Sequence, residues 1–137
     1  MRDPREWLVE ALRAAGRDPA EAGSLLPPRA LSRRAQAIAD LGIYEEAQRL
    51  LQSLVAGGRS VLRPALAELC LEIARVHEYM DDMPGALALY DQAIEALERV
   101  VVEGGYQHVE ALGKAYRLKA QVLEVLERKY LFRYYGP

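Results

Sequence analysis

The chain has 137 residues with 18 basic and 20 acidic side chains, so it is long enough to bury the core of one domain and carries a formal net charge of −2. This near balance argues against a polyanion as partner for the whole protein, and nucleic acid is not expected. The single cysteine, Cys70, excludes an internal disulfide, and no Cys/His cluster has the spacing of a zinc site. We therefore expect a reducing, cytoplasmic setting, with neither metal nor other cofactor.

The first segment, residues 1–28, is predicted to form an N-terminal capping helix followed by a short helix. Asp3-Pro4 and Asp18-Pro19 each place an N-cap residue before a proline at the first helical position. The segment lacks the uninterrupted apolar stretch of a signal peptide or a membrane span. We therefore expect a soluble protein with no membrane partner.

Two helical hairpins are predicted in the centre of the chain. In residues 29–58, apolar residues recur at helical spacing on both sides of Gly42, so this glycine is predicted to separate two antiparallel helices. In residues 59–105, the same pattern is divided by a turn at which Asp82 and Pro84 begin the second helix. A pair of glycines follows each hairpin and is predicted to end it.

The last segment, residues 106–137, is predicted to be one long helix that ends in an aromatic tail. This helix is predicted to be either the first helix of a third unit or a cap. Its apolar residues keep helical spacing without a breaker almost to Gly136. No run of alternating apolar and polar residues is long enough to predict a strand. The fold class is therefore predicted to be all α, and the four segments to form one structural domain.

Small residues recur along the chain with a fixed period. Ala35, Ala74 and Gly113 stand 39 residues apart, and so do Ala47 and Ala86. Small side chains at equivalent points allow paired helices to approach closely. These positions are therefore predicted to lie in the packing between helices.

This arrangement resembles the tetratricopeptide repeat (TPR), whose units are about 34 residues long and have small residues at set points of both helices. The best match combines Ala74, the turn at Asp82, Ala86 and Tyr90, and the resemblance covers roughly residues 29–118. It implies a short right-handed solenoid of stacked antiparallel hairpins, with about two full units, an incomplete or capping third, and capping helices at both ends. An unrelated helical bundle whose small residues coincide is the alternative.

In the TPR family, the first helices of the hairpins line a concave groove that receives a peptide or helix of another protein. The resemblance therefore implies a non-catalytic scaffold or adaptor. Carried over through the matched alanines, it assigns these residues to the groove: Ser32, Gln36, Ala39, Leu71, Arg75, Glu78, Tyr79, Glu110, Lys114 and Arg117. Arg75 and Glu78 are three residues apart, so an ion pair on a solvated helix face is the competing interpretation.

The aromatic tail leaves two interpretations open. Phe132, Tyr134 and Tyr135 could form an interface with a groove or a partner, or could seal the last helix against the core. Two full units are few, so apolar surface that they leave uncovered could be buried by a second copy in a homodimer. A self-associating structural subunit is thus the alternative function, and a nucleic-acid accessory factor that uses the basic C-terminal helix is a third.

No constellation of residues indicates an enzyme. His77 falls on the apolar stripe of its helix and is predicted to be a hydrogen-bonded core residue, while Asp81 and Asp82 are predicted to cap a helix. Cys70 lies on an apolar face with no histidine at an obvious spacing to activate it. Phosphate-binding, dinucleotide-binding and zinc-protease motifs are also missing from the sequence. We therefore predict no catalytic residues.

Overall fold

The structure, a computed structural model, describes residues 2–25 and 32–135, and side chains at all of these except 24, 25, 130 and 132–135. The described chain contains helices and no strand, which confirms the all-α prediction for this part. In chain order, the elements are α1 (Pro4–Ala14), η1 (Pro19–Leu25), α2 (Arg33–Ala56), η2 (Ser60–Leu62), α3 (Arg63–Tyr79), α4 (Met83–Val102), η3 (Tyr106–His108) and α5 (Val109–Tyr135), where η marks a 3₁₀ helix.

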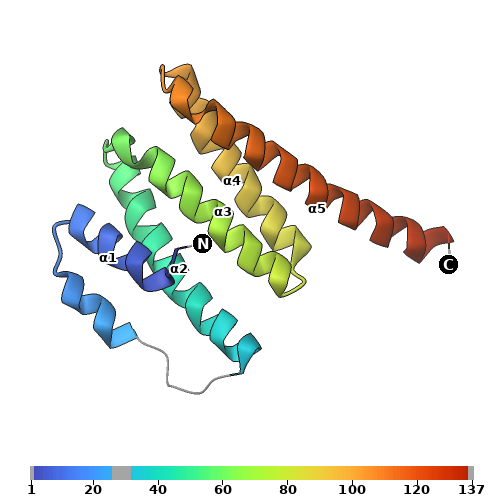
Figure 1. Ribbon diagram of the computed structural model, residues 1–137, viewed down its shortest axis with the longest axis horizontal. Coiled ribbons are helices and arrows are strands. Elements are labelled where there is room, and N and C mark those ends of the chain that lie inside the picture. Colours follow the sequence, from blue (N-terminus) through green and yellow to red (C-terminus); the bar gives the residue numbers. More distant parts are fainter. Residues whose placement is uncertain (1, 26–31, 136–137) are drawn as a thin grey trace.

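Each long helix packs against the next one along the chain, from α1 to α5 (Figure 1). The turn between α3 and α4 is only three residues long, so these helices form an antiparallel hairpin. The first turns of α2 extend past the end of α3, and the last turns of α5 extend past the α3–α4 turn (Figure 1). The result is an open array in which, among the described elements, α5 has a neighbouring long helix on one side only.

The hairpin predicted over residues 29–58 is wrong, because α2 runs from Arg33 to Ala56 without a break. Gly42 lies inside this helix. A glycine costs a helix about 1 kcal/mol relative to alanine, whereas burial of one large apolar side chain contributes roughly 1.5–3 kcal/mol. Ile43 and Tyr44, directly after the glycine, are both buried, so packing keeps the helix continuous.

The helices predicted in the other segments are present where the structure describes them, and their capping and repeat roles stay predictions. In residues 1–28, α1 begins after Asp3, whose side chain accepts a hydrogen bond from the Arg5 amide at 2.8 Å, and a short 3₁₀ helix follows. Residues 59–105 contain the α3–α4 hairpin, and residues 106–137 contain the long helix α5.

The periodic small residues do not share one role. Ala47, Ala74 and Ala86 are fully buried in the main core, as predicted. Ala35 and Gly113 are only half-buried and belong to neither core cluster, so the packing role predicted for them is wrong. The hairpin that was expected to place Ala35 does not form, and Gly113 lies on a part of α5 that no other helix covers.

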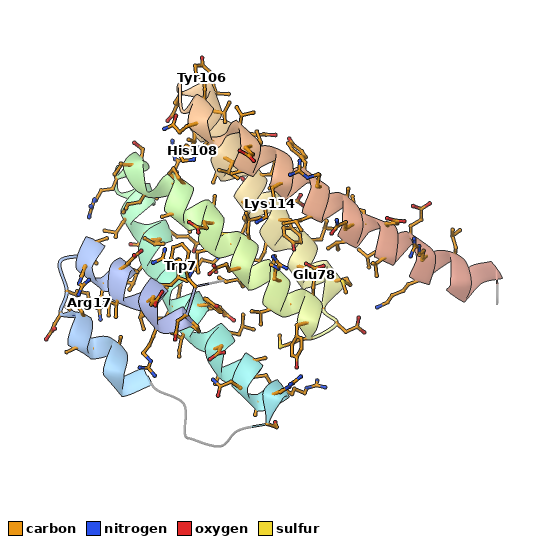
Figure 2. All side chains as sticks on the ribbon, viewed as in Figure 1. Trp7, Arg17, Glu78, Tyr106, His108 and Lys114 are labelled. Atoms are coloured by element: carbon orange, nitrogen blue, oxygen red, sulfur yellow. The ribbon has the colours of Figure 1, made fainter. Side chains whose placement is uncertain are left out.

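A buried carboxylate joins α1 to α3. Glu72 is 8% exposed and accepts hydrogen bonds from the Arg2 amide at 3.0 Å and from the Trp7 indole N–H. The Tyr44 hydroxyl donates to the Arg2 carbonyl at 3.0 Å, and burial together with the Glu72 charge raises the pKa of this phenol. The Arg2 guanidinium lies 3.9 Å from the centre of the Trp7 ring. Trp7 thus points from α1 toward the α2–α3 pair (Figure 2).

Candidate functional site

The candidate site is a pocket of about 470 Å³ between α2 and α3. Its lining residues come from the early turns of α2 and the last turns of α3. The α3 helix ends at Tyr79, and Asp81 then takes a left-handed conformation with φ 59°, which turns the chain away into α4. The lining residues come from both helices: Ala37, Asp40, Tyr44, Arg75, Val76 and Tyr79.

This pocket combines an apolar floor with charged and aromatic walls. Val76 and Tyr44 are buried, whereas Tyr79 at the end of α3 is 62% exposed. Arg75 is exposed and has no hydrogen bond or ion pair with any other described residue. Asp40 on α2 accepts a hydrogen bond from the Gln36 side chain at 2.8 Å. The pocket can therefore hold an apolar group between a positive and a negative side chain.

The structure brings only some of the predicted groove residues to this pocket. Arg75 and Tyr79 line it, and Gln36 lies beside it through its bond to Asp40. Ser32 is the N-cap of α2, where its hydroxyl accepts from the Ala35 amide at 3.2 Å. Ser32 is therefore a capping residue at the helix start.

Two predicted groove residues on α3 are occupied by other contacts. Leu71 is half-buried and packs against both core clusters, so its assignment to an open groove stays a prediction. Glu78 accepts a hydrogen bond from the Tyr90 hydroxyl of α4, and burial together with this bond raises the pKa of Tyr90. The competing prediction of an Arg75–Glu78 ion pair is also wrong, because no such pair forms between these described residues.

The remaining predicted residues lie away from the pocket. Glu110, Lys114 and Arg117 are exposed on the first half of α5, and Figure 2 shows Lys114 and Glu78 on different helices. These three residues of α5 do not line the α2–α3 pocket, and their assignment to a groove stays a prediction. The tail residues Phe132, Tyr134 and Tyr135 belong to the last turns of α5, but their side chains lie outside the described residues, so their predicted role stays a prediction.

Sequence reasoning missed the α2 wall of the pocket. Asp40 and Tyr44 were placed on either side of a turn at Gly42, so they were not expected to share one helix face. The signal was available, since Leu41, Tyr44 and Leu51 continue one apolar stripe across the glycine.

His77 and Asp82 form a hydrogen-bonded pair that joins α3 to α4. His77 Nδ1 lies 2.8 Å from Asp82 Oδ2, and the other Asp82 oxygen accepts from the Gly85 amide at 3.0 Å. The bond to His77, and then the bond to Gly85, lowers the pKa of Asp82. Asp82 caps α4 as predicted, and His77 is hydrogen-bonded as predicted but is only partly buried, so its predicted place in the core is wrong. Asp81 is no cap and pairs with Lys129 of α5 at 2.9 Å.

Replacing Asp82 with asparagine should flatten the acid limb of the stability curve. A carboxyl whose pKa is lowered by folding stabilises the protein above its unfolded pKa of about 3.9, and this stabilisation is lost as the pH falls through the lower folded value. The wild type should therefore lose more of its melting temperature than Asp82→Asn between about pH 5 and pH 3. Thermal melts followed by circular dichroism test this, and equal slopes would contradict the assignment.

The thiol of Cys70 is buried, and the part of the chain that the structure describes contains no metal-ligand cluster. Burial raises the pKa of the Cys70 thiol to about 11, and the thiol accepts a long hydrogen bond of 3.5 Å from Gln48. Among the described residues, no three His, Cys, Asp or Glu side chains gather where they could hold a metal ion. None of the described helices has both the length and the apolar character that crossing a bilayer requires.

No protein-family model matches the chain, and neither a curated protein nor a solved structure shows significant similarity to it. The geometry of the described residues therefore carries the functional interpretation. The central feature of this geometry is the α2–α3 pocket, which has the exposed ring of Tyr79 at its edge.

Proposed function

We propose that the chain is a non-catalytic protein-interaction module that holds a short segment of a partner protein at the α2–α3 pocket. The exposed Tyr79 ring beside the pocket carries this proposal. Tyrosine and arginine supply most of the binding energy in many protein interfaces, and here Tyr79 and Arg75 border one pocket. Its size falls within the roughly 300–1,000 Å³ of ligand sites.

The lining predicts the chemistry of the bound segment. Ala37, Val76 and the ring of Tyr44 favour one apolar side chain at the centre. Arg75 favours an acidic group beside it, and Asp40 favours a basic group on the α2 side. A helix or extended peptide with an apolar anchor between opposite charges meets these demands.

The same proposal includes a TPR-like arrangement, with α1–α2 and α3–α4 as its two hairpins. Each of these four helices contributes a fully buried alanine, namely Ala11, Ala47, Ala74 and Ala86. The helix α5 would then be the first helix of a third unit. A cytoplasmic location is part of the proposal, because the lone thiol of Cys70 suits a reducing compartment.

Removing both anchors should abolish partner binding. In quantitative capture from a lysate of the source cells, Arg75→Ala/Tyr79→Ala should lose at least about tenfold of the bound partner. The matched control is Arg49→Ala/Tyr106→Ala, which removes an exposed arginine and an exposed tyrosine from other surfaces. Titration of the recombinant partner segment then gives the loss of affinity.

Two outcomes would reject the site. A partner retained equally by the wild type and the Arg75→Ala/Tyr79→Ala variant would show that the pocket is not used. A partner lost equally from the control would show that binding depends on general surface properties. A photo-crosslinking residue in place of Ile38, which is exposed on α2 close to the pocket, should attach to the partner only while Arg75 and Tyr79 are intact.

A further inference from the structure

One face of α5 carries a row of apolar side chains that are about half exposed, and the Tyr116 hydroxyl on this face donates a hydrogen bond to Glu98 of α4. Val109, Tyr116 and Leu123 are 51%, 46% and 44% exposed, and they follow one another at intervals of seven residues. Gly113 and Ala120 lie between them, which gives the alternating four- and three-residue steps of a heptad repeat. We call these five residues the outer stripe of α5.

The outer stripe is distinct from the face that holds α5 on the protein. Ala115 and Val122 are fully buried against the core, and Leu118 and Leu126 pack beside them. The helix therefore has two apolar faces, and the face with Ala115 and Val122 is the one that packs against the core. A regular heptad on the other face is the pattern by which one helix pairs with another.

The order of side-chain sizes in the outer stripe suits a second copy in antiparallel orientation. About a two-fold axis between residues 121 and 122, Ala120 of one copy faces Leu123 of the other, and Leu123 faces Ala120. A small side chain thus meets a large one in both central layers. Parallel pairing would instead place Gly113 against Gly113 and Tyr116 against Tyr116, which leaves a gap in one layer and crowds the next.

Charged side chains beside the outer stripe are also complementary under this two-fold axis. Arg117 and Glu124 flank it seven residues apart, on the same side of the helix. The two-fold axis that pairs Ala120 with Leu123 brings Arg117 of each copy next to Glu124 of the other. Two opposite-charge pairs then border the centre of the contact.

We propose that α5 is a dimerisation helix through which two copies of this chain pair antiparallel, with Ala120 and Leu123 of the outer stripe at the centre of the contact. The α2–α3 pocket contributes nothing to this contact, so the dimer and the proposed partner site are independent of each other. A dimer would present two pockets at once, which strengthens binding to a partner with two matching segments.

Analytical ultracentrifugation of the full chain over a range of concentrations should show a dimer of the 15.3 kDa chain. Leu123→Glu places a carboxylate opposite Ala120 and next to Glu124, and should weaken the dimer by at least about tenfold. The matched control, Val102→Glu, changes an exposed apolar residue at the end of α4 and should leave the dimer intact. Circular dichroism should show the same helix content in both variants.

Charge exchange tests the pairing without changing the apolar stripe. Arg117→Glu and Glu124→Arg should each weaken the dimer by about threefold or more, because like charges then face each other across the contact. The double variant should regain affinity relative to both single variants. Glu124 also pairs with Arg128 within its own helix at 2.6 Å, and this pair is lost in Glu124→Arg and in the double variant alike. If the double variant dimerises more tightly than Glu124→Arg, the difference therefore comes from the contact between the two copies.

Crosslinking with a short bis-maleimide tests the orientation. In the antiparallel pair, the two copies of residue 120 are offset by about 5 Å along the helix, and the two copies of residue 110 by roughly 35 Å. Ala120→Cys should therefore crosslink and Glu110→Cys should not, while the wild type is the blank because Cys70 is buried. A monomer at all concentrations, a dimer insensitive to Leu123→Glu, or crosslinking at residue 110 would each overturn the proposal.

Discussion

Replacing Glu72 with alanine should lower the free energy of unfolding by about 2–4 kcal/mol. The change leaves the Trp7 indole N–H and the Arg2 amide without their acceptor, and it leaves a cavity between α1 and α3. Urea unfolding can be followed by the fluorescence of Trp7, the only tryptophan in the chain, and by circular dichroism.

Two control variants separate the effect of losing these hydrogen bonds from the effect of removing a negative charge. Glu68→Ala removes an exposed glutamate one turn earlier on the same face of α3 and should change stability by less than about 0.5 kcal/mol. Glu72→Gln keeps the shape but turns an amide N–H₂ toward a donor, so its cost should fall between those of the two alanine variants. A Glu72→Ala variant as stable as Glu68→Ala would show that the buried carboxylate does not hold α1 in place.

Replacing Ala74 with leucine should lower the free energy of unfolding by about 1–3 kcal/mol. Ala74 is fully buried in the main core, so three additional carbon atoms must displace neighbouring side chains or push the helices apart. The expected result is a lower urea midpoint with unchanged helix content at low denaturant.

Two further variants test whether the 39-residue period of the sequence is a packing period. Gly113→Ala should stabilise the protein by about 0.5–1 kcal/mol, because a Cβ there meets only Arg117 Nη1, at 3.4 Å, and alanine favours the helix. Ala35→Leu should change stability by less than about 1 kcal/mol at its half-buried position. A loss at Gly113 or Ala35 as large as that at Ala74 would show that all three positions need small residues.

Most helix ends could be predicted because the sequence marks them with local chemistry. Asp3 and Asp82 each accept a backbone amide at the start of a helix, and the prolines that follow them fit the first turn. The turn predicted at Gly42 was wrong because a glycine indicates only the local free-energy cost of continuing a helix. The burial that outweighs it at Tyr44 depends on α1 and α3, which lie far away along the chain.

The site could be predicted only in part, for the same reason. Arg75 and Tyr79 follow from the face of a single helix, and both line the pocket. Leu71 lies on that helix too, but it packs against core clusters that include residues of α5. The position of α5 cannot be predicted from the periodicity of α3. The role of Glu72 was equally out of reach, since its partner Trp7 is 65 positions away.

The hydrogen bond between Glu72 and the Arg2 amide also affects the order in which parts of the structure unfold. A leading segment ordinarily frays first, because its amides bond to water. Here the Arg2 amide donates to the buried carboxylate of Glu72 and the Arg2 carbonyl accepts from the buried Tyr44 hydroxyl, so both backbone polar groups of Arg2 are held. The start of α1 should therefore exchange its amide protons as slowly as the centre of the molecule, and melt together with it.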